Sequence, residues 1–184
     1  MVNIENNFLA PDEYEELTNL HIEYAKVHWI GAYAEPKNIL QKLVHKTLPK
    51  HSVIGATAWY NIRPTNPQWH NDISSYCTKN GVFYRPKKQP IHTHLYYVKS
   101  PETGGELVLE TGDIVTPEIN RHIFFSCDIN HRVKPYTGNR VSIGWIWWGD
   151  YPLYDNLNAK ENTRLERVWE SEDQASERGG RDAP

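Results

Sequence analysis

The sequence has little that would suit a disulfide scaffold or a nucleic-acid binder. Two cysteines, Cys77 and Cys127, occur in 184 residues, which excludes a framework of several disulfides and a cysteine-rich zinc module. The formal net charge is −3, so the chain lacks the basic excess with which polycationic proteins hold phosphate groups. We therefore expect no nucleic-acid partner.

Long apolar runs are also missing. No stretch approaches the roughly 18 consecutive apolar residues that a membrane-spanning helix needs. The start of the chain is too acidic and too interrupted to resemble a signal peptide. These absences predict a cytoplasmic protein without a membrane partner, and they leave its oligomeric state open.

Aromatic residues, in contrast, are abundant. They make up 12% of the chain, with seven Trp and eleven Tyr, a content typical of a packed globule. The length is slightly above that of a typical domain of about 150 residues. We expect one structural domain with supporting helices over residues 1–50, a β core over 51–150 and an extension over 151–184 that ends in a disordered tail.

The first fifty residues carry two helical patterns. Apolar residues spaced three and four apart predict an amphipathic helix over 11–29, with Pro11 in its first turn. A similar stripe predicts a second helix over 37–48, which Pro49 ends. Both helices are expected to cover a sheet rather than to carry chemistry.

The pattern changes from residue 51 onward. Short runs of β-branched and aromatic residues alternate with turns rich in Gly, Pro and Asn. The predicted strands cover 52–62, 69–76, 91–99, 105–109, 113–116, 121–126, 130–134 and 140–148. Eight short strands at this spacing predict a mostly β fold, a double-stranded β-helix of the jelly-roll or cupin-like type.

One short motif offers metal ligands. Residues i and i+2 of a strand face the same side, so His70 and Asp72 would point together. An imidazole and a carboxylate at one point form two-thirds of a facial triad for Fe(II). The third ligand must come from elsewhere in the chain, and His131 and His122 are both candidates. His92 and His94 share a strand face and could form an unrelated metal pair.

A second motif would bind an anion. A turn separates His131 from Arg140, so the two residues should lie on neighbouring antiparallel strands. Arg140 and Ser142 again share a face. A guanidinium group and a hydroxyl group make paired, charge-assisted hydrogen bonds to a carboxylate.

Together these motifs resemble the Fe(II)/2-oxoglutarate-dependent oxygenases. His-x-Asp is followed by a distant His and, nine residues later, by Arg-x-Ser. Over about residues 55–148 the order of segments is similar to that of the prolyl-hydroxylase-like branch. The matching segments are His94–Val98, Gly104–Leu107, Arg121–Phe125, His131 and Arg140.

The resemblance implies a set of site residues and a reaction. The implied Fe(II) ligands are His70, Asp72 and His131, which are also the implied catalytic residues. His131 is preferred to His122 because only His131 precedes Arg140 by the nine residues that are typical of the family. The residues implied for binding 2-oxoglutarate (2OG) are Arg140, Ser142, Tyr97 and Tyr60. The implied reaction uses O2, with ascorbate in support, to hydroxylate a C–H bond while 2OG is converted to succinate and CO2.

The branch suggests a peptidyl substrate with proline as the modified residue.

The chain departs from the branch in two places. The segment between Asp72 and Tyr97 is longer than usual, and its basic run at 85–88 could contact a substrate. Ile146 stands where some relatives that act on peptidyl proline carry a large aromatic residue. Two alternatives therefore stay open: the same chemistry on a small molecule such as a free amino acid, and a non-catalytic cupin-type module that holds a metal or small ligand.

Overall fold

The computed structural model describes residues 1–20, 27–50, 53–61, 68–72, 77–79, 82–84 and 92–148. The chain divides into two compact units. One unit comprises Met1–His28, Ala58–Asp72 and Ile91–Ile146, and the other comprises Trp29–Thr57, Ile73–Pro90 and Trp147–Pro184. All of the metal- and anion-binding residues predicted from the sequence belong to the first unit.

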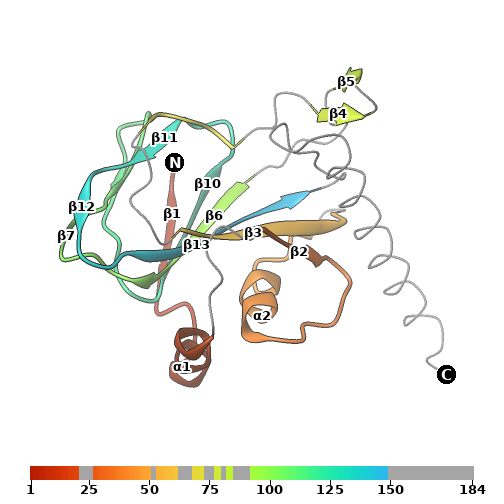
Figure 1. The fold of residues 1–184 in the computed structure, drawn as a ribbon, viewed down its shortest axis with the longest axis horizontal. Helices are drawn as coiled ribbons and strands as arrows, with labels where there is room; N and C mark the ends of the chain where they lie inside the picture. The colour runs from red at the N-terminus through yellow and green to blue at the C-terminus, as the bar shows by residue number, and fades with distance from the viewer. Residues whose placement is uncertain are drawn as a thin grey trace. The chain divides into compact units, whose positions relative to one another are not determined.

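The larger of the two main sheets has the strand order β1-β10-β6-β13-β3-β2 (Figure 1). Its strands are β1 (Asn3–Asn6), β2 (Val27–Gly31), β3 (Gly55–Asn61), β6 (His92–Lys99), β10 (Arg121–Ser126) and β13 (Val141–Trp148). The central pairs are antiparallel, with Leu95 of β6 opposite both Ile123 of β10 and Gly144 of β13.

The smaller sheet belongs to the first unit. It has the order β11-β8-β9 and consists of β8 (Leu107–Leu109), β9 (Ile114–Val115) and β11 (His131–Val133). Beside it, β7 (Thr103–Gly104) pairs with β12 (Tyr136–Thr137). The core side chains come from both sheets: Leu95, Tyr97, Leu107, Leu109, Val115, Ile123 and Phe125. Two antiparallel sheets around one apolar core confirm the predicted mostly β, jelly-roll fold.

The helices differ from their predicted lengths. Helix α1 (Pro11–Asn19) begins at the expected proline, and the Glu13 carboxylate accepts the Ala10 N–H at 3.0 Å. The prediction that this helix continues to residue 29 was wrong, because Val27–Gly31 is strand β2. Residues 21–26 lie outside the described part of the chain. The β-branched and aromatic side chains of Val27, Trp29 and Ile30 suit a strand better than a helix.

The second helix was placed correctly. Helix α2 (Ile39–His45) lies inside the predicted range 37–48, and the Asn38 side chain caps it by accepting the Gln41 N–H at 3.0 Å. Its buried residues are Ile39, Leu40, Leu43 and Val44. Neither helix in the described ranges has the length and apolar character to cross a bilayer.

Several strands gave no sequence signal. Strand β1 has a single apolar residue, Ile4, and exists because its backbone pairs with β10 along the edge of the sheet. Strand β12 lies where the sequence predicts a turn. The hairpin of β4 (Cys77–Lys79) and β5 (Val82–Tyr84) also lies outside the predicted runs.

Two histidines form a buried network on the face of the large sheet that points away from the core. His94 Nδ1 lies 3.1 Å from His122 Nε2, and His122 Nδ1 lies 3.0 Å from a Glu5 carboxylate oxygen. Both imidazoles stack on the Trp145 ring, at centroid distances of 5.2 and 5.3 Å. His122 is therefore engaged away from His70 and Asp72, and His94 is committed to His122 rather than to a metal pair with His92.

This network makes stability depend on pH. Burial, helped by the charges of His122 and His92, lowers the pKa of His94 to about 2. Burial also lowers the pKa of His122, and Glu5 opposes that effect. In the unfolded chain both residues take up protons below about pH 6.5, whereas the folded protein keeps His94 neutral.

We therefore expect the free energy of unfolding to fall as the pH drops from 7.5 to 5. The His94→Gln variant should lose less stability over the same range, because one proton-binding group is missing from its unfolded state. Urea unfolding at the two pH values measures both quantities. An equal loss in the variant and the wild type would show that other groups carry the effect.

Candidate active site

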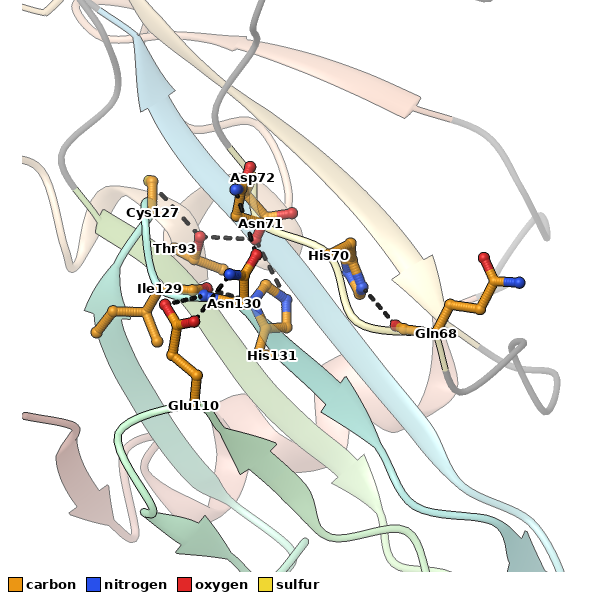
Figure 2. Close-up of polar contacts among 10 residues, drawn as sticks. All are labelled: Gln68, His70, Asn71, Asp72, Thr93, Glu110, Cys127, Ile129, Asn130 and His131. Carbon is orange, nitrogen blue, oxygen red and sulfur yellow. Dashed lines mark hydrogen bonds and ion pairs between the residues drawn. The ribbon is translucent and has the colours of Figure 1, made fainter.

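Two backbone hydrogen bonds join histidines that are 61 residues apart in the sequence. The His70 N–H donates to the His131 carbonyl at 3.1 Å, and the His131 N–H donates to the His70 carbonyl at 2.7 Å. Residues directly opposite each other in an antiparallel pair have side chains on the same face. The two imidazoles accordingly lie together, with 4.3 Å between their ring centroids (Figure 2).

Asp72 completes the cluster. One potential ligand atom from each of His70, Asp72 and His131 lies within 4.8 Å of the other two, and His131 Nε2 is 3.6 Å from Asp72 Oδ2. The Asp72 N–H donates to the Cys127 carbonyl at 3.0 Å, which fixes the backbone of the carboxylate residue. Two imidazoles and one carboxylate on one side of a point are the donor set of the facial triad for non-haem Fe(II).

Backbone carbonyls determine which nitrogen of each imidazole is available. His131 Nδ1 donates to the Ile129 carbonyl at 3.1 Å, and His70 Nδ1 donates to the Gln68 carbonyl at 3.2 Å. A carbonyl oxygen can only accept, so Nδ1 carries the proton and Nε2 keeps a lone pair for a metal. Burial lowers the pKa of His131, against the opposing charge of Asp72, and favours the neutral form that binds metals.

A hydrogen-bonded clamp holds the start of β11. The Asn130 N–H and the Asn130 side-chain amide donate to the two carboxylate oxygens of Glu110, at 3.0 and 2.8 Å. These two hydrogen bonds lower the pKa of Glu110. Asn130, which precedes His131, is thus held to Glu110 at the end of β8. This contact fixes the backbone from which the His131 side chain extends into the site.

A buried arginine lies in the same cavity. Arg140 is 3% exposed, and its Nη1 donates to the Ser142 hydroxyl at 3.0 Å. Its guanidinium carbon lies 5.2 Å from the ring centroid of Tyr97 and 5.9 Å from that of Tyr136. Within the described ranges, Arg140 Nε, Arg140 Nη2 and the Tyr97 hydroxyl are buried without a hydrogen-bond partner.

These orphaned groups fit an anion. Buried polar groups in native proteins nearly always have partners, and a buried charge without one is costly. A carboxylate offers two oxygens, which can accept from the two free guanidinium nitrogens and from a phenol. The Tyr97 phenol stays protonated, because burial raises its pKa in spite of the neighbouring Arg140 charge. The residues present therefore suit a ligand with a carboxylate at its inner end.

The cavity that Arg140 and the three residues of the cluster line has a volume of about 270 Å³. Its polar lining comes from the His70, Asp72 and His131 cluster and, in addition, from Arg140, Asn61 and Thr93. Its apolar lining is Trp59, Leu95, Leu107, Phe125 and Val133. His131 is buried and His70 is exposed, so the cavity opens to solvent on the His70 side. The geometry therefore provides an outer place for a metal and an inner place for an anion.

Three predicted site residues are not part of the cavity lining. Tyr97 and Ser142 both contact Arg140, which does line it. The Tyr60 ring instead packs edge-on against His28 at a centroid distance of 6.0 Å. Its neighbours on β3, Trp59 and Asn61, line the cavity instead, because side chains alternate along a strand. A Cβ at Gly144 would come within 2.6 Å of the Trp59 indole, so only glycine lets this ring lie against β13.

Other predictions concern residues outside the described ranges. These are residues 73–76, the basic run at 85–88 and the tail over 151–184. Within the described part of the strand predicted over 69–76, His70 forms a single bridge with His131 and no strand is present.

Comparison with known proteins identifies the fold. No family model and no curated protein sequence matches the chain. Among solved structures, a truncated viral collagen prolyl hydroxylase from Paramecium bursaria Chlorella virus-1 is similar at 18% identity, with a TM-score of 0.57 over 79% of this chain and 88% of its own. A 2OG complex of that hydroxylase is similar at 19% identity, with a TM-score of 0.54 over 80% and 95%.

A third similar structure contains a peptide. It is a prolyl hydroxylase from Trichoplax adhaerens in complex with a hypoxia inducible factor oxygen degradation domain peptide fragment. The identity is 19% and the TM-score is 0.52, over 89% of this chain and 86% of that one. At these identities the likeness shows that this chain has the jelly-roll fold of these prolyl hydroxylases.

The unpartnered charge of Arg140 leads to a prediction about stability. We expect Arg140→Met to raise the free energy of unfolding of the ligand-free protein by about 1 kcal/mol, because removing an uncompensated buried charge outweighs losing one hydrogen bond. Urea unfolding measures the change.

Arg121→Met is the matched control. Arg121 donates to the Asn6 side chain and to the Thr116 carbonyl, each at 2.8 Å, and pairs with Glu118 at 2.6 Å. Its loss should destabilise the protein. If Arg140→Met lowered the free energy of unfolding as much as Arg121→Met does, the result would contradict the view that Arg140 is an anion-binding residue without a counter-charge in the ligand-free protein.

Proposed function

We propose that the chain is an Fe(II)- and 2OG-dependent dioxygenase that hydroxylates a peptidyl substrate, with proline as the expected residue. The observation that carries this proposal is the meeting, in one cavity, of a His-Asp-His cluster and a buried arginine, two of whose guanidinium nitrogens have no partner among the described residues. Either feature alone would fit many proteins. Together they match the two ends of a 2-oxo diacid, one of which binds a metal while the other binds a cation.

His70, Asp72 and His131 would hold Fe(II) on one side, leaving the opposite side open to ligands. When bound, the iron would supply the oxidative chemistry by which O2 and 2OG yield succinate, CO2 and a hydroxylated substrate. The chain's own residues would bind the metal and the cosubstrate and orient them. Arg140, Ser142 and Tyr97 would hold the distal carboxylate of 2OG and so fix the angle of the whole cosubstrate.

The cavity wall supports this use. Leu95, Leu107, Phe125 and Val133 surround the space between the arginine and the metal cluster. An apolar wall suits the methylene groups of 2OG and keeps water from the inner carboxylate, where each hydrogen bond is then stronger. The buried charge of Arg140 is tolerated in the fold because the cosubstrate would neutralise it.

The outer rim favours a peptide over a small molecule. His70 is exposed, and the neighbouring Trp69 is 46% exposed, with the Arg132 guanidinium 4.9 Å from its ring centroid. An aromatic ring and a cation beside an open site suit the contacts that a polypeptide makes. A structurally similar prolyl hydroxylase binds a peptide fragment. The burial of Arg140 argues against a simple cupin-type binding module, which has no need of an anion anchor.

Turnover tests the proposal. The protein supplied with Fe(II), 2OG, O2 and ascorbate should form succinate and a peptide heavier by one oxygen atom, in equal amounts, with proline-containing peptides. The His131→Ala variant should keep its fold by circular dichroism but lose bound iron and all turnover.

Two outcomes would count against this account. Wild-type protein that forms no succinate, either with peptides or uncoupled from them, would overturn the proposed activity. Full iron stoichiometry in His131→Ala would show that the third ligand is a different residue.

A further inference from the structure

Thr93 on β6 contacts the carboxylate of the metal cluster, and neither the sequence motifs nor the resemblance assigns it a role. Its hydroxyl donates to Asp72 Oδ2 at 2.7 Å (Figure 2). We propose that Thr93 is a positioning residue that fixes the Asp72 carboxylate in its metal-binding orientation. This inference rests on the proposed function, since it concerns the same metal site.

The contact selects one carboxylate oxygen. Oδ2 is the oxygen that accepts from Thr93, and it is also the oxygen 3.6 Å from His131 Nε2. A carboxylate can rotate about its last side-chain bond, and a short hydrogen bond to one oxygen restricts that rotation. Thr93 thereby sets which oxygen faces the imidazole and where the remaining lone pairs point.

The hydroxyl group has one proton to give. An ionised carboxylate can only accept, so this proton is committed to Asp72. The second polar neighbour of the Thr93 hydroxyl is Cys127 Sγ, at 3.6 Å. The Cys127 carbonyl also accepts the Asp72 N–H at 3.0 Å. Thr93 and Cys127 thus hold Asp72 by both its side chain and its backbone, as the dashed lines of Figure 2 show for the hydroxyl contacts.

Thr93 is itself held firmly. It is 3% exposed and lies in the middle of the large sheet, opposite Phe125 on β10 and Ile146 on β13. A strand that is paired on both sides is a rigid support for a site, more so than the short segment that carries Asp72. The carboxylate ligand therefore takes its orientation from the sheet rather than from its own segment.

Metal affinity measures this role. Loss of a hydrogen bond to a metal ligand typically weakens metal binding by about 10- to 100-fold. Titration of the purified protein with Co(II), a stable stand-in for Fe(II), should give a Kd that rises by that factor in Thr93→Val, which keeps the shape of the side chain but removes the hydroxyl. Thr93→Ser keeps the hydroxyl and should bind Co(II) like the wild type.

Thr57→Val is the matched control. Thr57 is also a buried threonine on a strand of the large sheet, and its hydroxyl accepts from Trp148 Nε1 at 2.9 Å. Both residues belong to the second unit, which does not contain the metal cluster. This variant should lose stability but not Co(II) affinity. Urea unfolding of all variants separates a loss of fold from a loss of affinity. If Thr93→Val does not fold, Thr93→Ala replaces it, with the same expected rise in Kd.

The outcomes distinguish this inference from the proposed function. Wild-type Co(II) affinity in the variant without the hydroxyl would overturn the role of Thr93 and leave the metal site intact. Equal losses of Co(II) affinity in Thr93→Ser and Thr93→Val would also overturn the role of Thr93, because the hydroxyl group would then have no effect on metal binding. Wild-type protein that binds neither Co(II) nor Fe(II) would overturn the proposed function itself.

Discussion

The paired backbone hydrogen bonds between His70 and His131 are the constraint on which the site depends. They make the two residues direct neighbours across an antiparallel bridge, so both imidazoles must lie on the same face. Asp72 lies two residues further along and joins them, and Thr93 holds its carboxylate from the adjacent sheet. A one-residue slip in this pairing would turn the imidazoles to opposite faces and dismantle the cluster.

The buried arginine explains why the inner half of the cavity is built as it is. Arg140 lies near the rings of Tyr97 and Tyr136, donates to Ser142 and keeps two nitrogens without partners in the described part of the chain. An arrangement of this kind costs stability until an anion arrives. Sites that bind charged ligands often keep such a cost, because the groups that would relieve it in the free protein would also compete with the ligand.

Much of this site could be predicted from sequence, because a spacing of two residues in extended backbone brings His70 to Asp72 and Arg140 to Ser142. The expected strand pairing was wrong: β11 pairs with β8, and Arg140 lies just before β13 of the larger sheet rather than on a strand beside His131. The pairing of His70 with His131 needed the spacing of a known family, since nothing local joins residues so far apart. For Tyr60, the sequence could not show which face of β3 meets the cavity, because alternation shows which residues share a side but not which side that is; Trp59 and Asn61 line the cavity. Strands β1 and β2 were missed for a related reason: partners far along the chain determine their pairing. Thr93 gave no signal at all, since a threonine in a strand is ordinary until its neighbour is known to be a ligand.

A crystal structure with Mn(II) and 2OG, prepared without O2, would test the central claim most directly. We expect one ion bound to His70 Nε2, His131 Nε2 and an Asp72 oxygen, with the distal carboxylate of 2OG on Arg140. An ion that touches fewer than these three residues, or a 2OG molecule whose distal carboxylate lies away from Arg140, would contradict the account.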